Sequence, residues 1–445
     1  MAVIVGCDLG RKSAHDVVIL RRETAQQGGR AFRFTSTPEG VDQLFRQIQK
    51  VRQNNEPVAF VIDSPGKAWV PVTSAIKARG FAVYRPTGVR FSKMRQAGDR
   101  KNKTNRIDAM ALARCLLNFP QDTQQVFLPC GTQAQLDQLV RQRDRVVDSI
   151  RRRKQRIQDF TEVINPTLSN AMGSFALTEA GRAFLRTYLD PRKAVRAGQK
   201  RLTQFLQKRY RLNLDPQVAQ AIFKACTQAV ALYLSAREEN RIPFDETLLQ
   251  EEMNWELDQL ESEEDRLREL NTRIRTCNQK LDPHDCMISL PGIQHILAAG
   301  IQSCVGDIDR FDSLTKHRGF AGLYPVAKGT GDKQAQGTRI CKMSSNRYKR
   351  YLYLAAENAY KWDVQLAAFY HAKREAGHTH TQAVCAVANG KLLPRIHHMR
   401  KQMKLVEGTT LRRPSYVFKD LSGNPISKAE AKAIIQAKWG DVTYA

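Results

Sequence analysis

Three aspartates stand at positions where an acidic metal site could be built. Asp8 ends the apolar run 2–8 (AVIVGCD), Asp63 follows the apolar run 57–62 (PVAFVI), and Asp108 lies in 105–118 (NRIDAMALARCLLN). Carboxylates at the ends of adjacent central strands, with a third from a later helix, can bridge two Mg²⁺ ions that activate an attacking oxygen and stabilise a leaving one. Taken alone, an Asp after a strand is more often a turn residue or a helix cap. The order of the three favours a two-metal Mg²⁺ site.

Asn105 precedes Asp108 by three residues at the start of the same helix, which places both side chains on one face. An Asn side chain can ligate Mg²⁺ through its carbonyl oxygen, but it adds no negative charge and cannot act as a base. The alternative is that Asn105 only caps the helix. Both interpretations remain open at this point.

A second candidate centre lies in the glycine-rich and basic segment 318–356. An alcohol that attacks a phosphodiester needs exposure and a nearby cation. The candidate hydroxyls are Thr330, Ser344 and Ser345, and the candidate cations are Lys328, Lys333, Lys342 and Arg347. The alternative is a loop that only binds phosphate.

The elements that must position the three aspartates alternate in a recognisable order. Period and composition predict strands at 2–8, 16–20, 31–36, 57–62 and 81–85, and helices at 38–53, 68–79 and 105–118. The order β-β-β-α-β-α-β-α indicates a mixed sheet flanked by helices, which is the ribonuclease H-like arrangement.

Long helices follow from residue 134. One heptad seam holds Leu136, Leu139, Val146, Ile150, Ile157, Phe160 and Ile164, with Arg143 and Arg153 in its two missing places, and a second holds Met253, Leu260, Leu267, Ile274 and Leu281. The seams could form an antiparallel hairpin within the chain or pair with another subunit.

The predicted fold class is therefore α/β plus α. We divide the chain into a metal-site domain at 1–125, a helical coiled-coil region with an insertion at 126–282, a mainly helical domain at 283–405, and a basic appendage at 406–445. The third part opens with 290–301 (LPGIQHILAAGI), a glycine turn before a helix that resembles half of a helix-hairpin-helix, although Gln294 stands where a second Gly is usual.

The charge balance points to an acidic partner. Lys and Arg number 71 against 44 Asp and Glu, a formal net charge of +27. Nucleic acid is the predicted partner; the alternatives are a solvated basic surface or a patch for anionic lipid. The strongest basic run, 141–157, contains Arg151, Arg152, Arg153 and Lys154.

Other classes of protein are disfavoured. The nine cysteines show no zinc-ligand spacing, so we expect reduced and mostly buried thiols. No apolar stretch is long enough to cross a bilayer and the N-terminus does not read as a signal peptide, so the expected location is the cytoplasm, with no membrane partner.

At this point the residues resemble a known family, the insertion-sequence transposases with a DEDD catalytic set, which include the bridge-RNA-guided recombinases related to the pilin-gene invertase. The segments GCDLG, the acid at Asp63 and NKTNRIDAMALA look like the family's RuvC-like (ribonuclease H-like) domain. The segments that look like its C-terminal transposase domain are SLPGIQHILAAGI, DRFDSLTKHRGFAGLYP, GTGDK and KMSSNRYKRYLYLAA.

The resemblance implies recombination of a mobile element with target DNA, guided by a structured RNA that the element encodes. It implies a homo-oligomer, from a dimer to a tetramer, in which the metal site of one subunit meets the serine-bearing domain of another. In that scheme a serine hydroxyl attacks the DNA backbone and forms a covalent protein–DNA intermediate, while the acidic site positions Mg²⁺ at the same phosphate.

This chain departs from the family pattern at three site residues. Asp63 stands in place of a Glu, Asn105 in place of the first acid of Asp-x-x-Asp, and Thr330 in place of the serine of Ser-Gly. The threonine methyl group adds crowding at phosphorus, which predicts reduced activity unless Ser344 or Ser345 substitutes. A long insertion at roughly 166–250 is a fourth difference.

The function predicted from the sequence is a DNA transposase or recombinase that binds double-stranded DNA and a guide RNA. Two alternatives belong to other classes. One is a non-catalytic regulator that still binds nucleic acid. The other is a Mg²⁺-dependent junction nuclease that cleaves DNA with the acidic metal site alone.

Overall fold

The computed structural model describes residues 3–10, 14–23, 29–53, 55–63, 66–98, 104–209, 216–326, 329–330, 333–334, 339–340, 346–409 and 412–440. The chain forms two compact units. The first comprises Met1–Asp137 and Asn278–Ala445, and the second comprises Gln138–Cys277.

A six-stranded mixed sheet with its helices forms the N-terminal part of the first unit. Its strands lie in the order β3-β2-β1-β4-β5-β6, with β1 parallel to β4, β4 parallel to β5, and the other neighbours antiparallel. The bounds are β1 Val3–Asp8, β2 His15–Arg21, β3 Arg30–Phe34, α1 Pro38–Gln49, β4 Val58–Asp63, α2 Trp69–Ala78, β5 Ala82–Pro86, α3 Gly88–Gly98, α4 Asn105–Asn118 and β6 Thr123–Gln125.

This part of the chain confirms the predicted mixed α/β architecture. All five strands and all three helices expected from the sequence are present, and the bounds of α4 agree with the predicted 105–118. Helix α3 and strand β6 were not predicted. Helix α3 has no apolar stripe by which the sequence would indicate a helix, and β6 is only three residues long (Thr123–Gln125).

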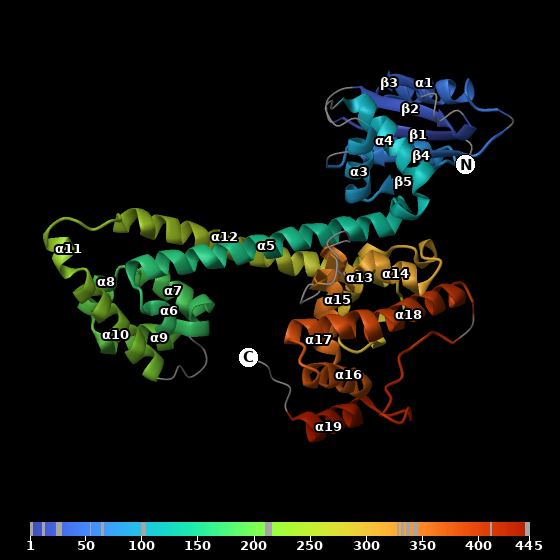
Figure 1. Ribbon diagram of the computed structural model, residues 1–445. Helices are drawn as coiled ribbons and strands as arrows, with labels where there is room; N and C mark the ends of the chain where they lie inside the picture. The colour runs from blue at the N-terminus through green and yellow to red at the C-terminus, as the bar shows by residue number, and fades with distance from the viewer. Residues whose placement is uncertain are drawn as a thin grey trace. The chain divides into compact units, whose positions relative to one another are not determined.

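The alternation of side chains gives the sheet two separate apolar cores. One face of β1, β2 and β4 contributes Val5, Val17 and Phe60, which pack with apolar residues of α1 and α2. The opposite face contributes Ile4, Val18 and Val61, which pack with apolar residues of α4. Helix α4 is drawn crossing the strands on its own face of the sheet (Figure 1).

Helix α4 approaches β1 more closely than a side chain would permit, because residue 6 is glycine. A Cβ at Gly6 would lie 2.0 Å from the carbonyl oxygen of Ala109 and 2.8 Å from the amide nitrogen of Ala113. Small residues on α4, namely Ala109 and Ala113, complete the contact. The helix backbone therefore rests directly on the strand that ends in Asp8.

The described secondary structure of the second unit consists of helices joined by turns and loops. Two long helices, α5 and α12, run antiparallel, since contacts join Arg143 to Asn271, Ser149 to Glu263 and Arg153 to Glu256. The bounds are α5 Gly131–Ile164, α6 Leu168–Met172, α7 Glu179–Tyr188, α8 Pro191–Ala197, α9 Gln199–Arg209, α10 Pro216–Leu232, α11 Leu234–Glu238 and α12 Glu246–Gln279. Of the two pairings that the sequence left open, the structure therefore shows the hairpin within the chain.

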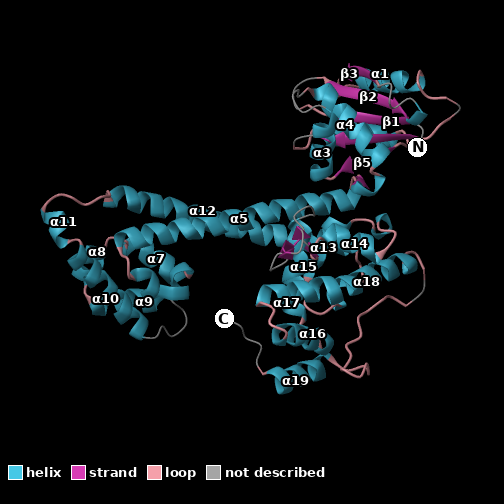
Figure 2. Cartoon of the chain, viewed as in Figure 1, coloured by secondary structure: helices cyan, strands magenta, loops and turns pink. Residues whose placement is uncertain are grey.

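The residues after 283 form a second part of the first unit, which is mostly helical (Figure 2). Its described strands are each two residues long. The bounds are α13 His295–Val305, α14 Leu314–Ala321, β7 Pro325–Val326, β8 Gly329–Thr330, β9 Lys333–Gln334, β10 Arg339–Ile340, α15 Asn346–Ala359, α16 Val364–Glu375, α17 His380–Val387, α18 Leu393–Val406 and α19 Lys428–Trp439. Among the described helices, none is both long and apolar enough to cross a membrane.

Packing accounts for two sequence features of this helical part. Gly292, in the turn before α13, has a φ of +73°, and a Cβ there would lie 2.4 Å from the amide nitrogen of Ala359, so close packing on α15 demands the glycine. The appendage after 406 ends in α19, which buries Ala431 and Ile435 against Val364 and Ala367 of α16.

The close contact between β1 and α4 yields a stability prediction. The substitution Gly6→Ala should destabilise the protein by about 1–3 kcal/mol or more, because the added methyl group must push the α4 backbone away from the sheet. Thermal unfolding of the full chain measures the effect. The matched control is Gly319→Ala within α14, where a Cβ meets nothing within 4 Å, and which should stabilise by about 0.5–1 kcal/mol. Equal effects of the two substitutions would contradict the contact.

Candidate active site and nucleic-acid interface

The ends of β1 and β4 bring Asp8 and Asp63 side by side. These two residues are register partners in the parallel pair, so their side chains leave the same face of the sheet about 4.8 Å apart along the hydrogen-bonding direction. That face is the one covered by α4, because Ile4 and Val61 on the same alternation pack against it. The predicted pairing of these two acids at one edge of the sheet is present.

Helix α4 brings Asn105 and Asp108 to the same face. The helix is capped by Thr104, whose hydroxyl accepts a hydrogen bond from the amide of Ile107 at 3.3 Å. The alternative role of Asn105 as the cap is therefore wrong, since Asn105 is the first helical residue. Its side-chain amide is free to point at the sheet, where it donates to Asp16 Oδ2 at 3.3 Å.

Asp16 also lies at the candidate site, although the sequence did not indicate it. It is the antiparallel register partner of Asp8, so Asp16, Asp8 and Asp63 form one row across β2, β1 and β4. The sequence predicts Asp16 only as the first residue of the strand 16–20. The signal that could have found it is the hairpin register, because a strand that leaves Asp8 and returns after a short turn places its first residues opposite the acid.

Arginine side chains lie near three of these carboxylates, those of Asp63, Asp16 and Asp108. Arg85 Nη2 lies 3.0 Å from Asp63 Oδ1, Arg33 Nε lies 3.0 Å from Asp16 Oδ1, and Arg95 Nε lies 3.9 Å from Asp108 Oδ1. The site therefore combines clustered carboxylates with arginine side chains that partly neutralise their negative charge. The exposed fraction of the side chain rises from 11% at Asp16 to 41% at Asp63, so the row opens to solvent at the Asp63 end.

The donors at this edge fit a hard divalent cation. All of them are carboxylate or amide oxygens, which Mg²⁺ prefers, and Asp108 Oδ1 is buried without accepting any hydrogen bond. In the part of the chain that the structure describes, no three His, Cys, Asp or Glu groups already converge closely enough to hold one ion. Metal binding would therefore require the carboxylates to turn away from their arginine partners.

Cys7 and His15, which neighbour Asp8 and Asp16 in the sequence, belong to the opposite face of the sheet. Burial, and secondarily the charge of Asp8, raises the pKa of the Cys7 thiol, which is inaccessible in the core with α1 and α2. Burial lowers the pKa of His15, whose ring contacts Phe34 and hydrogen-bonds Ser36. Neither side chain belongs to the acidic row.

A basic pocket borders α4 on the side of α3. It has a volume of about 240 Å³, and its lining includes Arg95, Arg106 and Arg114. Arg95 also approaches Asp108, so guanidinium groups lie next to the acidic row. Such groups suit the phosphates of a nucleic acid. The sequence signal was the basic stretch before and within 105–118, which we had interpreted only for its acids.

The candidate hydroxyl Thr330 lies at the end of β8, in a hairpin where it pairs with Lys333 of β9. The structure describes only the backbone here. Ser344, Ser345, Lys328 and Lys342 fall outside the described residues. Arg347 is the second residue of α15, where it forms an ion pair with Asp137 and is largely buried. Whether Thr330 meets the acidic row stays a prediction.

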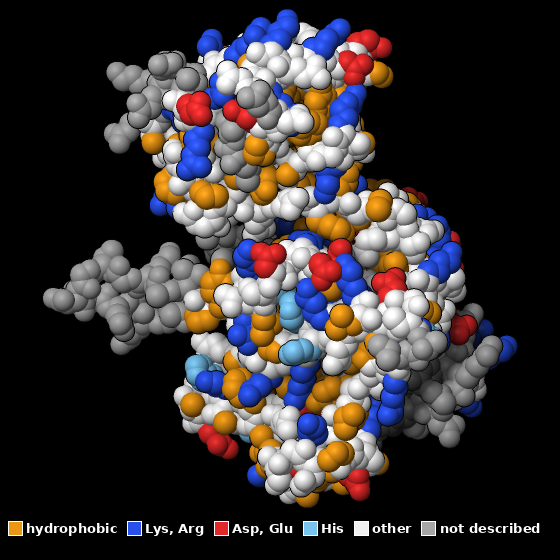
Figure 3. Space-filling view, turned by 90° about the vertical axis from the view of Figure 1, so that its right-hand side faces the viewer, with side chains coloured by type: hydrophobic (Ala, Val, Ile, Leu, Met, Phe, Trp, Pro, Cys, Tyr) orange, Lys and Arg blue, Asp and Glu red, His pale blue; other side chains and the backbone are white. Residues whose placement is uncertain are grey.

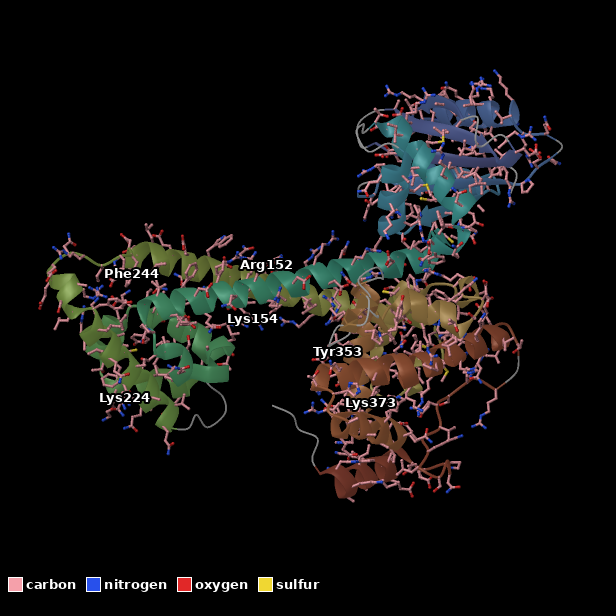
Figure 4. The ribbon with its side chains drawn as sticks, in the orientation of Figure 1. Arg152, Lys154, Lys224, Phe244, Tyr353 and Lys373 are labelled. Atoms are coloured by element: carbon pink, nitrogen blue, oxygen red, sulfur yellow. The ribbon has the colours of Figure 1, made fainter. Side chains whose placement is uncertain are left out.

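The basic residues 151–154 of α5 divide into exposed residues and residues that form ion pairs with α12. Arg151 and Arg152 are exposed, and Lys154 lies 3.7 Å from Glu264. Arg153 instead faces α12, with 2.8 Å to Glu256 and 2.9 Å to Glu263. Arg152 and Lys154 are labelled along α5 in Figure 4. The geometry thus favours a nucleic-acid contact for Arg151 and Arg152 over one for Arg153.

Basic side chains are also spread widely over the molecular surface. On the face drawn in Figure 3, Lys and Arg side chains occur over both the N-terminal sheet region and the C-terminal helices, with fewer Asp and Glu among them. This distribution agrees with the excess of 71 Lys and Arg over 44 Asp and Glu. It favours a long contact with a polyanion over a single small site.

Two family models match this chain. Residues 5–166 match a DEDD transposase model of IS110 type, and residues 284–371 match the model described as "Transposase IS116/IS110/IS902 family". The first match contains Asp8, Asp16, Asp63, Asn105 and Asp108. The second contains the Thr330 hairpin.

Proteins of three bacterial insertion elements are similar to this chain. The insertion element IS116 protein of Streptomyces clavuligerus is 26% identical over 79% of this chain and 84% of its own length. The IS110 protein of Streptomyces coelicolor is 21% identical over 88% of this chain and 92% of its own length. The IS900 protein of Mycobacterium paratuberculosis is 28% identical over 54% and 60% of the respective lengths.

The two classes of arginine on α5 should respond differently to neutralisation. The substitution Arg152→Gln should weaken DNA binding and lower the salt slope of log K by about 1, because one exposed cation no longer releases counterions. Its matched neighbour, Arg153→Gln, should leave that slope unchanged but destabilise the helical unit by about 1–3 kcal/mol. It removes the ion pairs of Arg153 with Glu256 and Glu263, although Arg156 still pairs with Glu256. Fluorescence anisotropy at several salt concentrations and thermal melts measure both. A lower slope in Arg153→Gln alone would reverse the assignment.

Proposed function

Because this chain belongs to the IS110 family of DEDD transposases, we propose that it joins the DNA of an insertion element to target DNA through a covalent protein–DNA intermediate, with Mg²⁺ held at the acidic row. The observation that carries this proposal is the register of β1 with β4. It sets Asp8 beside Asp63 on the face where α4 supplies the buried Asp108.

The residues that would hold the metal are Asp8, Asp63 and Asp108, with Asn105 offering a carbonyl oxygen. When bound, divalent metal supplies charge to polarise a phosphodiester and to stabilise the oxygen that leaves it. The protein's own contribution is to hold the carboxylates on rigid strand ends and a helix, so that little reorganisation is needed during the reaction. Arg95 and Arg106, in the pocket beside α4, would orient the DNA backbone by contacts to its phosphates.

The attacking group in this proposal is the Thr330 hydroxyl. Its oxygen forms a bond to phosphorus, the bond between phosphorus and a deoxyribose oxygen breaks, and that oxygen takes up a proton. The resulting phosphoester keeps the energy of the broken bond, so the strand can be passed to a new partner by the reverse attack. Support comes from the β8–β9 hairpin, which sets Thr330 opposite Lys333 within the second family match.

The proposed partners are double-stranded DNA of element and target, and a structured guide RNA. The net charge of +27 and the exposed basic residues of α5 support polyanion binding. We further propose a homo-oligomer of two to four subunits, as the family resemblance implies. We keep the division at residues 125, 282 and 405, a coiled-coil α5–α12 pair, and a cytoplasmic location as parts of this proposal.

The central test is a covalent-adduct assay. Purified protein with its element's flanking RNA, Mg²⁺ and a nicked suicide DNA should give an adduct that survives denaturing gel electrophoresis. The variants Thr330→Ala and Asp8→Ala should each lower the yield by at least about 10²-fold, since each removes a group acting at the reacting phosphate. Asp42→Asn, an exposed carboxylate of α1 paired with Arg79, is the matched control and should keep full yield.

Other outcomes of this assay lead to different conclusions. An adduct that survives Thr330→Ala but is lost in Ser344→Ala or Ser345→Ala would move the nucleophile to that serine. Cleavage that needs Mg²⁺ but leaves no adduct would favour the junction nuclease. Tight DNA binding with neither cleavage nor adduct would favour the non-catalytic regulator.

A further inference from the structure

We infer that Asp16 is the fourth carboxylate of the metal site and restores the negative charge that is missing at Asn105. The inference rests on the proposed function, because it concerns the same acidic row. It adds a residue of β2 to a set otherwise drawn from β1, β4 and α4.

The sheet register places Asp16 within reach of the site. Asp16 is directly opposite Asp8 in the antiparallel β1–β2 pair, and side chains directly opposite each other have Cβ atoms about 4.5–5.5 Å apart on the same face. Val18 and Leu20, which share the alternation of Asp16 on β2, pack in the core beneath α4. Asp16 therefore leaves the sheet on the side of α4, as Asp8 and Asp63 do.

The hydrogen bond from Asn105 ties Asp16 to the helix end of the site. Asn105 Nδ2 lies 3.3 Å from Asp16 Oδ2, so the neutral residue on α4 is in direct contact with a carboxylate from β2. This bond uses the amide nitrogen of Asn105 and leaves its carbonyl oxygen for other partners. Asn105 and Asp16 together thus place one negative charge where Asn105 alone places none.

Charge balance gives this extra carboxylate a reason. Two divalent cations carry four positive charges, whereas Asp8, Asp63 and Asp108 carry three negative ones. A partly buried site that lacks one charge binds cations less tightly, because interactions are less screened there than in water. Adding Asp16, whose residue exposure is only 8%, brings the count to four.

One buried oxygen of the site accepts no hydrogen bond, and its ion-pair partner Arg95 stays 3.9 Å away, which points independently to a ligand at this place. Asp108 is 8% exposed, and its Oδ1 accepts no hydrogen bond. It lies one helical turn after Asn105, on the helix that covers β1 and β2. Leaving such an oxygen unsatisfied is unfavourable, and a bound cation would offset that cost.

The present partner of Asp16 would not prevent metal binding. Arg33 Nε lies 3.0 Å from Asp16 Oδ1, but the Arg33 side chain is 69% exposed. An ion pair with so exposed a partner contributes little to stability, because water screens it. A divalent cation can therefore take over this carboxylate at small cost.

The test is a titration of the full-length protein with Mn²⁺, in which electron paramagnetic resonance counts the free ion. The near-isosteric substitution Asp16→Asn should raise the dissociation constant at least about tenfold, while Asp42→Asn should leave it unchanged. The double variant Asp16→Asn with Asn105→Asp returns one charge to the other side of the same hydrogen bond and should recover most of the affinity. Thermal melts in chelator check that each variant is folded.

Two results would overturn the inference. If Asp16→Asn binds Mn²⁺ as the wild type does, while Asp8→Asn does not, the metal site stands but Asp16 is only a hydrogen-bond partner. If Asp16→Asn binds Mn²⁺ weakly, and adding Asn105→Asp to that variant does not recover the affinity although the protein is folded, Asp16 acts by its position and not by its charge. A wild type that binds no Mn²⁺ at all would instead remove the metal from the proposed function itself.

Discussion

The backbone of α4 rests on Gly6 of β1 without a side chain between them, and the acidic site depends on this contact. Gly6 lies two residues before Asp8 on the same face of β1. The close distance between α4 and β1 that Gly6 permits therefore also sets how far α4 lies from the Asp8 carboxylate. Alanines on the facing side of α4 keep the gap small. With a larger residue at position 6, Asp108 and Asn105 would move away from the row of strand-end acids.

From this contact the chemistry of the site follows in steps. Parallel pairing of β1 with β4 places Asp63 beside Asp8, and antiparallel pairing of β1 with β2 places Asp16 on the other side. Helix α4 adds Asp108 from above, and α3 with α4 forms the arginine-lined pocket next to it. The combination of clustered acids with flanking guanidinium groups suits a phosphodiester, in which metal ions neutralise the reacting group and arginines hold its neighbours.

Much of this arrangement could be predicted from the sequence, and the failures have physical causes. Strands and helices were found where apolar runs and periods were strong, and Asp8, Asp63 and Asp108 followed from their places at the ends of those runs. Asp16 was missed because its role depends on the register of a hairpin, which a period-two pattern alone does not reveal. Arg153 was predicted to bind nucleic acid together with its basic neighbours. Its position in the heptad seam of α5 instead indicates contact with α12, where it pairs with Glu256 and Glu263. Thr330 was identified by the resemblance of its segment to a family motif, and the role of its hydroxyl as the attacking group stays a prediction.

The central claim is that the α4 face of β1 and β4 holds divalent cations. Crystals of the full-length protein grown with Mn²⁺ and measured at a wavelength where manganese scatters anomalously test it directly. The account predicts anomalous density in bonding contact with the carboxylates of Asp8 and Asp63. Well-ordered crystals in which manganese occupies other sites while this row stays bound to its arginines would contradict it.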